Sequence, residues 1–287
     1  LYQMVRDGQL APLDYFDLIA DGLKTESNDM LLGSIIGGHS QIAQVYWEYL
    51  TKAQRELKAT EFEDIFMERV LKSTPGSSLQ MSFYDFFLRV VQSKPNVTRL
   101  QESLKRNLPP KGIVFDQDRR WAIINALAMN NAPEIESIIE QEKIKDPSTM
   151  GQRQAYGARA AVPQEAIKRE YWKDFFNNPE LLYTNFKQAA DRIHHPNYLE
   201  HSQNYVDAYF KQVTKMDWEK QDSVQDIYFE SLFPRDLCSA ELLKRSQREM
   251  QRARKLTPLA RRTWMETNDE LARCVRIRTT RSTKPDA

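Results

Sequence analysis

Residues 118–172 read DRRWAIINALAMNNAPEIESIIEQEKIKDPSTMGQRQAYGARAAVPQEAIKREYW, and this stretch decides the fold class. Apolar residues recur three and four positions apart, beginning with Trp121 and Ile124, which places them on one face of a helix. Prolines such as Pro133 and Pro163 stand between these groups, where each opens a new helix at a first turn that tolerates the missing N–H. The stretch therefore predicts several short helices in succession.

The same pattern of apolar groups separated by helix-start signals continues toward both ends of the sequence. Thr60 and Glu63 form a capping-box pattern ahead of an apolar group, which predicts a helix start near Thr60. Toward the C-terminus, Ser239 predicts one helix start and Thr257 with Pro258 predicts another. Glycine is scarce, at nine residues, and the alternating pattern of strands hardly occurs.

These signals predict an all-α fold of about 14–16 helices, each about 10–17 residues long. Short helices without a heptad seam favour antiparallel pairs stacked into an α-α superhelix, a solenoid of the HEAT or armadillo kind. No strict repeat period is visible, so any repeats are degenerate. We expect one helical domain over residues 1–278 and a basic, disordered tail over residues 279–287.

The composition is that of a globular protein, with 41% apolar residues and a formal net charge of +1 in 287 residues. The near-zero charge gives no bulk attraction to nucleic acid or membrane surfaces. Apolar runs are too short to cross a bilayer, and no signal peptide is present. Cys238 and Cys274 are too few for a disulfide framework or a zinc ribbon. A cytoplasmic location, in a reducing compartment, is the expectation.

Three of the four histidines cluster in RIHHPNYLEHSQNYVDAY, residues 192–209, and raise the question of a metal site. A catalytic zinc ion needs three protein ligands, and a helical histidine pair serves it at four-residue spacing. His194 and His195 are adjacent, and His201 belongs to the next helix. The pattern predicts no zinc site, and the common nucleotide-binding and hydrolase motifs are also missing.

Several segments together resemble the helical C-terminal domain of the aminopeptidase N family, in bacterial form. HPNYLEHSQNYVDAYF at 195–210 resembles a P-Y-V-x-x-Y-F-like motif, with Asn204 where the proline often stands. MVRDGQLAPLDYFDLI at 4–19 resembles the opening helix pair, and LTPLARRTWMETNDELARCVRIR at 256–278 resembles the end. The middle resembles R-W, D-x-S-x-x-G, A-x-P and K-x-x-x-W, at positions Arg120, Trp121, Asp146, Ser148, Gly151, Ala160 to Pro163, Lys168 and Trp172.

The resemblance implies the noncatalytic domain of a zinc-dependent aminopeptidase that removes N-terminal residues from peptides. Such a domain closes the active-site chamber and limits substrate access. Its partners would be the catalytic domain of the same polypeptide and peptide substrates. The family's H-E-x-x-H zinc motif, its G-A-M-E-N segment and its catalytic tyrosine have no matching positions here. We therefore expect no catalytic residue and no cofactor in this chain, with zinc in the parent enzyme's catalytic domain. Leu1 opens inside a helical pattern, which indicates part of a longer protein.

Lysines and arginines exceed acids in the last part of the chain, which supplies candidate substrate contacts. Arg245, Arg248 and Arg252 can share a helix face, and Arg261 and Arg262 follow on the next helix. A guanidinium group binds a carboxylate through two parallel hydrogen bonds, which suits a peptide's C-terminus. The alternative is an ordinary solvated basic face. At the level of the whole protein, the alternative is a free-standing α-solenoid scaffold for protein–protein interaction.

Overall fold

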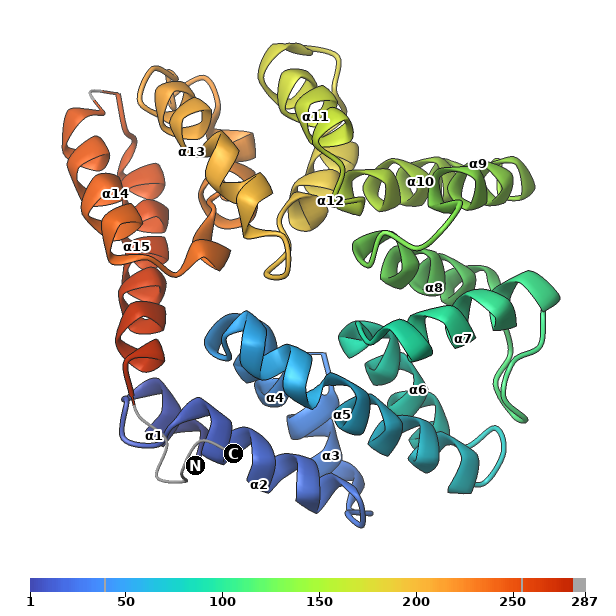
Figure 1. Ribbon diagram of the computed structural model, residues 1–287. Helices are drawn as coiled ribbons and strands as arrows, with labels where there is room; N and C mark the ends of the chain where they lie inside the picture. The colour runs from blue at the N-terminus through green and yellow to red at the C-terminus, as the bar shows by residue number, and fades with distance from the viewer. Residues whose placement is uncertain (39, 254, 281–287) are drawn as a thin grey trace. The chain divides into compact units, whose positions relative to one another are not determined.

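The computed structural model describes residues 1–38, 40–253 and 255–280. These residues form 15 α-helices and no β-strand, which confirms the predicted class and number of helices (Figure 1). Two π-helical and two 3-10 segments, η1 to η4, lie between them. The α-helices are α1 (Tyr2–Arg6), α2 (Pro12–Leu23), α3 (Asp29–Ile36), α4 (Gln41–Gln44), α5 (Lys52–Lys72), α6 (Ser78–Val90), α7 (Lys94–Arg106), α8 (Gln117–Met129), α9 (Ile135–Lys145), α10 (Thr149–Ala161), α11 (Glu165–Asn177), α12 (Tyr183–Ile193), α13 (Leu199–Val213), α14 (Ala240–Arg252) and α15 (Pro258–Arg278).

The described residues divide into two compact units. Unit 1 comprises residues 1–132 with the segment that begins at Arg276, and unit 2 comprises residues 133–275. Helix α15 therefore begins in unit 2 and ends in unit 1. Of the predicted tail, residues 281–287 lie outside the described residues, whereas Thr279 donates a hydrogen bond of 2.6 Å to the Arg276 carbonyl group. The single domain over 1–278 stays a prediction.

Aromatic side chains form the core of unit 1. Phe62 and Phe66 lie four positions apart on α5, so both project from one face of the helix. Phe62 contacts Phe16 of α2 at a ring-centroid distance of 4.6 Å, and Phe66 contacts Phe86 of α6 at 4.7 Å. All four rings are buried. One face of α5 therefore holds α2 and α6 together.

Helix α5 begins earlier than the sequence analysis predicted. Its capping box is formed by Thr51, whose hydroxyl accepts from the Gln54 N–H, while the Gln54 side chain accepts from the Thr51 N–H at 2.9 Å. The predicted capping box at Thr60 and Glu63 is wrong, because both residues lie inside the helix. The residues between, KAQRELKA, are strong helix formers, so the helix continues through the second pattern.

Glu63 instead caps a different helix from its buried position on α5. Its carboxylate accepts hydrogen bonds of 2.8 Å from the N–H groups of Gln92 and Ser93, just before α7. It also accepts from the Asn96 side chain at 3.0 Å. Burial raises the pKa of Glu63, and these hydrogen bonds oppose the increase.

The sequence D-x-S-x-x-G in unit 2 has a direct structural meaning at the start of α10. Ser148 caps the helix by accepting from the Gly151 N–H at 3.0 Å, and Asp146 accepts from the Ser148 hydroxyl at 2.6 Å. A Cβ atom on Gly151 would lie 2.2 Å from the Asp146 carbonyl oxygen. Further along α10, a Cβ atom on Gly157 would lie 2.6 Å from Gln188 of α12. The small residues therefore allow a tight N-terminal turn and close packing on α12.

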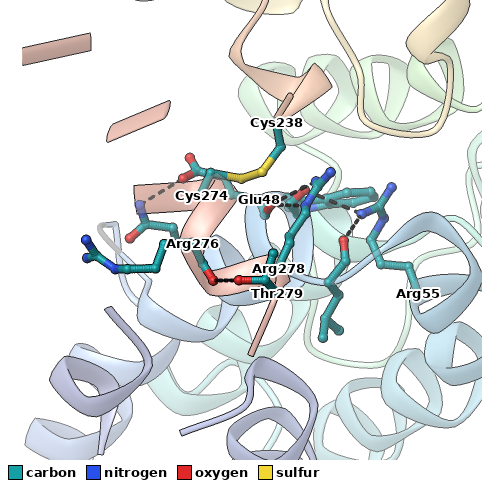
Figure 2. The surroundings of a disulfide bond; sticks show 10 residues. Glu48, Arg55, Cys238, Cys274, Arg276, Arg278 and Thr279 are labelled. Atoms are coloured by element: carbon teal, nitrogen blue, oxygen red, sulfur yellow. Dashed lines mark hydrogen bonds between the residues drawn. A yellow bond between two sulfur atoms is a disulfide. The ribbon is translucent and has the colours of Figure 1, made fainter. Parts of the chain in front are cut away.

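Cys238 and Cys274 form a disulfide bond within unit 2, between the end of η4 (Arg235–Leu237) and α15 (Figure 2). Because the two cysteines are paired with each other, they do not support the reducing compartment that the sequence analysis expected. The cytoplasmic location itself stays a prediction. In unit 1, the last residue of α15, Arg278, donates to the Glu48 carbonyl group at 2.9 Å (Figure 2).

Candidate functional site

The structure places the three predicted arginines of the first group on one helix. Ser239 caps α14 by accepting hydrogen bonds from the N–H groups of Glu241 and Leu242 at 3.2 and 3.3 Å. The helix then runs without a break from Ala240 to Arg252. Arg245, Arg248 and Arg252 therefore share one side of α14, as their spacing predicted.

Arg245 serves a structural role. Its guanidinium group forms an ion pair with Asp207 of α13 and lies 5.1 Å from the centre of the Phe210 ring. The side chain is 31% exposed. An arginine that is held by a carboxylate and an aromatic face ties α14 to α13.

Arg248 and Arg252 are more open. Both lie near one oxygen of the Glu249 side chain, at 3.5 Å from Arg248 Nε and 3.4 Å from Arg252 Nη1. Their side chains are 58% and 65% exposed. Two arginines that share one carboxylate oxygen retain most of their donors for another acceptor, and exposed pairs of this kind contribute little to stability.

Arg261 and Arg262 lie in the first two turns of α15 and are exposed. Arg262 pairs with Glu266 one turn later, at 2.8 Å, and this hydrogen bond raises the pKa of the guanidinium group. In the described part of the chain, no carboxylate lies within ion-pair distance of Arg261. Whether any of the five arginines contacts a substrate stays a prediction.

The histidine stretch forms structural contacts. His194 is half-buried, with Nδ1 2.8 Å from the Ser202 hydroxyl and Nε2 3.0 Å from the Leu232 carbonyl oxygen. His201 lies 3.3 Å from Glu165, and His195 Nδ1 accepts from the Asn197 N–H. His39 lies outside the described residues.

His194 is engaged at both ring nitrogens, and His195 and His201 each have a contact at Nδ1. Across residues 1–38, 40–253 and 255–280, no group of three or more His, Cys, Asp or Glu side chains is placed to hold a metal ion. Within the same ranges, no helix has both the length and the apolar character needed to cross a membrane.

Lys168 is a feature that sequence reasoning did not single out as functional. Its ammonium group is buried on α11 and donates to the Ala160 carbonyl group at the end of α10, at 2.6 Å. Burial lowers the pKa of Lys168 to about 7. Trp172, one turn later, stacks on Tyr205 at 5.1 Å. The K-x-x-x-W spacing thus places a capping ammonium group and a packing ring on one face of α11.

A cleft of about 340 Å³ opens beside α11. Its carboxylates already have partners. Glu170 accepts two hydrogen bonds of 2.8 Å from Arg159, and Asp174 accepts from Tyr156 and from the Asn178 amide group. Both carboxylates of the cleft are therefore already engaged within the protein.

Two comparisons relate the chain to known proteins. Residues 1–273 match the model of a family described as ERAP1-like C-terminal domain. Over 181 residues, the chain is 27% identical to a protein named Aminopeptidase N from Streptomyces lividans. The match covers 63% of this chain and 20% of that protein, so it spans about a fifth of the relative's length.

Proposed function

Because the chain belongs to the ERAP1-like C-terminal domain family, we propose that it is the helical domain that closes the active-site chamber of a zinc-dependent aminopeptidase. The match over residues 1–273 carries this proposal, and the similarity to an aminopeptidase N supports it. We propose further that the helix pairs form a superhelical wall beside a catalytic domain of the same polypeptide. The zinc ion and the reacting groups would then belong to that catalytic domain.

A wall of this kind contributes to catalysis without contacting the reacting atoms. It excludes bulk water from the chamber, so fixed dipoles of the catalytic domain act more strongly on the developing charge. It also limits the size of substrate, because a short peptide enters an enclosed chamber and a folded protein does not.

Of the predicted arginines on α14, Arg248 and Arg252 are the ones better suited to attract a peptide's C-terminal carboxylate. Both are more than half exposed, and both share a single carboxylate oxygen of Glu249. Arg245 is less suited because Asp207 and Phe210 hold it. We propose that the pair on α14 faces the substrate and raises the local concentration of anionic peptide ends.

Steady-state kinetics of the intact protein tests this role. We expect Arg248→Gln with Arg252→Gln to raise KM for short peptides severalfold, and to leave KM unchanged for an aminoacyl reporter without a carboxylate. Lys72→Gln is the matched control, since it removes an exposed, paired cation from α5. Equal effects on peptide and reporter would remove the arginines from substrate binding.

The free-standing scaffold has a different signature. A scaffold would show no H-E-x-x-H motif in the reading frame before Leu1, whereas a peptidase would. Peptide hydrolysis by the intact protein would likewise exclude the scaffold. Sequencing upstream therefore separates the two functions without any variant.

A further inference from the structure

Glu249 lies on α14 between the arginine side of the helix and its buried side. Leu242 and Ser246 are the buried residues of α14. Helical spacing places Glu249 between these two residues and the pair Arg248 and Arg252. The Glu249 side chain is 13% exposed, whereas those of the two arginines are 58% and 65% exposed. The carboxylate is therefore the least exposed of the three charged side chains.

The contacts between Glu249 and the two arginines are long. One oxygen, Oε1, lies 3.5 Å from Arg248 Nε and 3.4 Å from Arg252 Nη1. A charge-assisted hydrogen bond between a guanidinium group and a carboxylate is typically about 2.7–2.9 Å long, and a bidentate pair makes two of them. Neither arginine forms such a pair with Glu249, so a peptide carboxylate can form the shorter hydrogen bonds without displacing one.

Glu249 therefore affects a bound anion mainly through its charge. Two guanidinium groups and one carboxylate leave a net charge of +1 (2 − 1) at neutral pH. Arg245 adds little to this sum, because Asp207 is paired with it. A peptide that ends in a neutral residue brings one carboxylate to the site, whereas a peptide that ends in aspartate or glutamate brings two. Glu249 repels each of these carboxylates, so it reduces what the second one gains from the arginines.

We propose that Glu249 determines the substrate class of the α14 site by limiting the preference of Arg248 and Arg252 for acidic peptide ends. The site then selects a peptide by its single C-terminal carboxylate more than by the charge of its last side chain. This inference rests on the proposed role of the two arginines in substrate binding. Glu249 is a specificity-determining residue that acts by repulsion, and it makes no bond to the peptide.

The ratio of two KM values measures this selectivity in the intact protein. The substrates are two short peptides that differ only in the C-terminal residue, which is asparagine in one and aspartate in the other. We expect Glu249→Gln to lower KM for the aspartate peptide about threefold more than KM for the asparagine peptide. That is the effect of removing the repulsion between two charges about 6 Å apart in water. The difference should shrink in about 0.5 M salt, which screens exposed charges.

Two further variants separate the charge of Glu249 from other causes. Glu249→Asp keeps the negative charge on a shorter side chain, so the ratio of the two KM values should stay at its wild-type value. If Glu249 had only a structural role, the shorter side chain would disturb the site as the amide does. Glu68→Gln is the matched control, since it removes an exposed, paired carboxylate from α5 and should leave the ratio unchanged.

The possible failures are distinguishable. An unchanged ratio in Glu249→Gln would overturn the inference, and so would the same change in Glu249→Asp or in Glu68→Gln. If KM for the peptides rises in Arg248→Gln with Arg252→Gln while Glu249→Gln leaves the ratio unchanged, the proposed substrate site stands and only the role of Glu249 is wrong. If the arginine double variant leaves KM for both peptides unchanged, the substrate site and this inference are both wrong.

Discussion

The disulfide bond between Cys238 and Cys274 should be a major source of the stability of unit 2. It closes a loop of 36 residues that contains all of α14 and most of α15. Cross-linking a loop of that length lowers the entropy of the unfolded chain, and the chain-entropy treatment gives about 4 kcal/mol of stabilisation near room temperature. Reduction of the bond should therefore remove about 4 kcal/mol from the unfolding free energy.

Urea unfolding, followed by far-ultraviolet circular dichroism, measures this loss directly. With a urea dependence of about 2 kcal/mol per molar, a loss of that size moves the midpoint down by about 2 M. We expect the shift when a phosphine reductant is added to the wild-type protein. The Cys238→Ser, Cys274→Ser double variant should unfold at the reduced midpoint and should not respond to the reductant.

Two results would refute the reasoning. Two free thiols, titrated in unfolded protein that was never reduced, would show that the bond does not form. A bond that forms but shifts the midpoint by less than about 0.5 M would show that loop closure is not what stabilises unit 2.

Three further outcomes are expected. Gly151→Ala should destabilise the protein by about 1–3 kcal/mol in thermal or urea unfolding, because the new Cβ would lie 2.2 Å from the Asp146 carbonyl oxygen. Gly22→Ala is the control. It should be neutral or stabilising, because no atom lies within 4 Å of the added Cβ. Burial raises the pKa of Glu63 above its ordinary value of 4.5, so the unfolding free energy should fall as pH rises through that raised pKa. Glu63→Gln should remove this pH dependence of the unfolding free energy. The same pH dependence in the variant and the wild type would contradict the assignment to Glu63. The 287-residue chain alone should not hydrolyse an aminoacyl reporter with zinc added. Turnover by the pure chain would contradict the proposal that the zinc ion and the reacting groups belong to a separate catalytic domain.

The sequence predicted best where the signal is local. Ser239 caps α14 and Pro258 opens α15, both as predicted, because a cap depends on residues within one turn. The capping box at Thr60 failed for an equally local reason. The segment before it is itself strongly helical and carries its own capping box at Thr51, so α5 begins a full two turns earlier.

For the candidate arginines, spacing predicted the shared helix face but not the partners of each side chain. Spacing alone placed Arg245, Arg248 and Arg252 on one face of α14, and the helix has that face. Spacing could not show that Arg245 pairs with Asp207, which lies 38 positions earlier, or that Arg248 and Arg252 share Glu249. Only the packing of α14 on α13 distinguishes a structural arginine from an open one.

By itself, the sequence determined the all-helical class, the starts of α14 and α15 and the order of motifs that indicates the family, because periodicity, caps and prolines act over a few residues. Tertiary structure decided what the polar residues do. Glu63 caps a helix about 30 positions away, Cys238 pairs with Cys274, and His194 meets Asp236 through Ser202. Each of these depends on a buried contact between distant segments, and the free energy of a buried polar group depends on the partner it finds there.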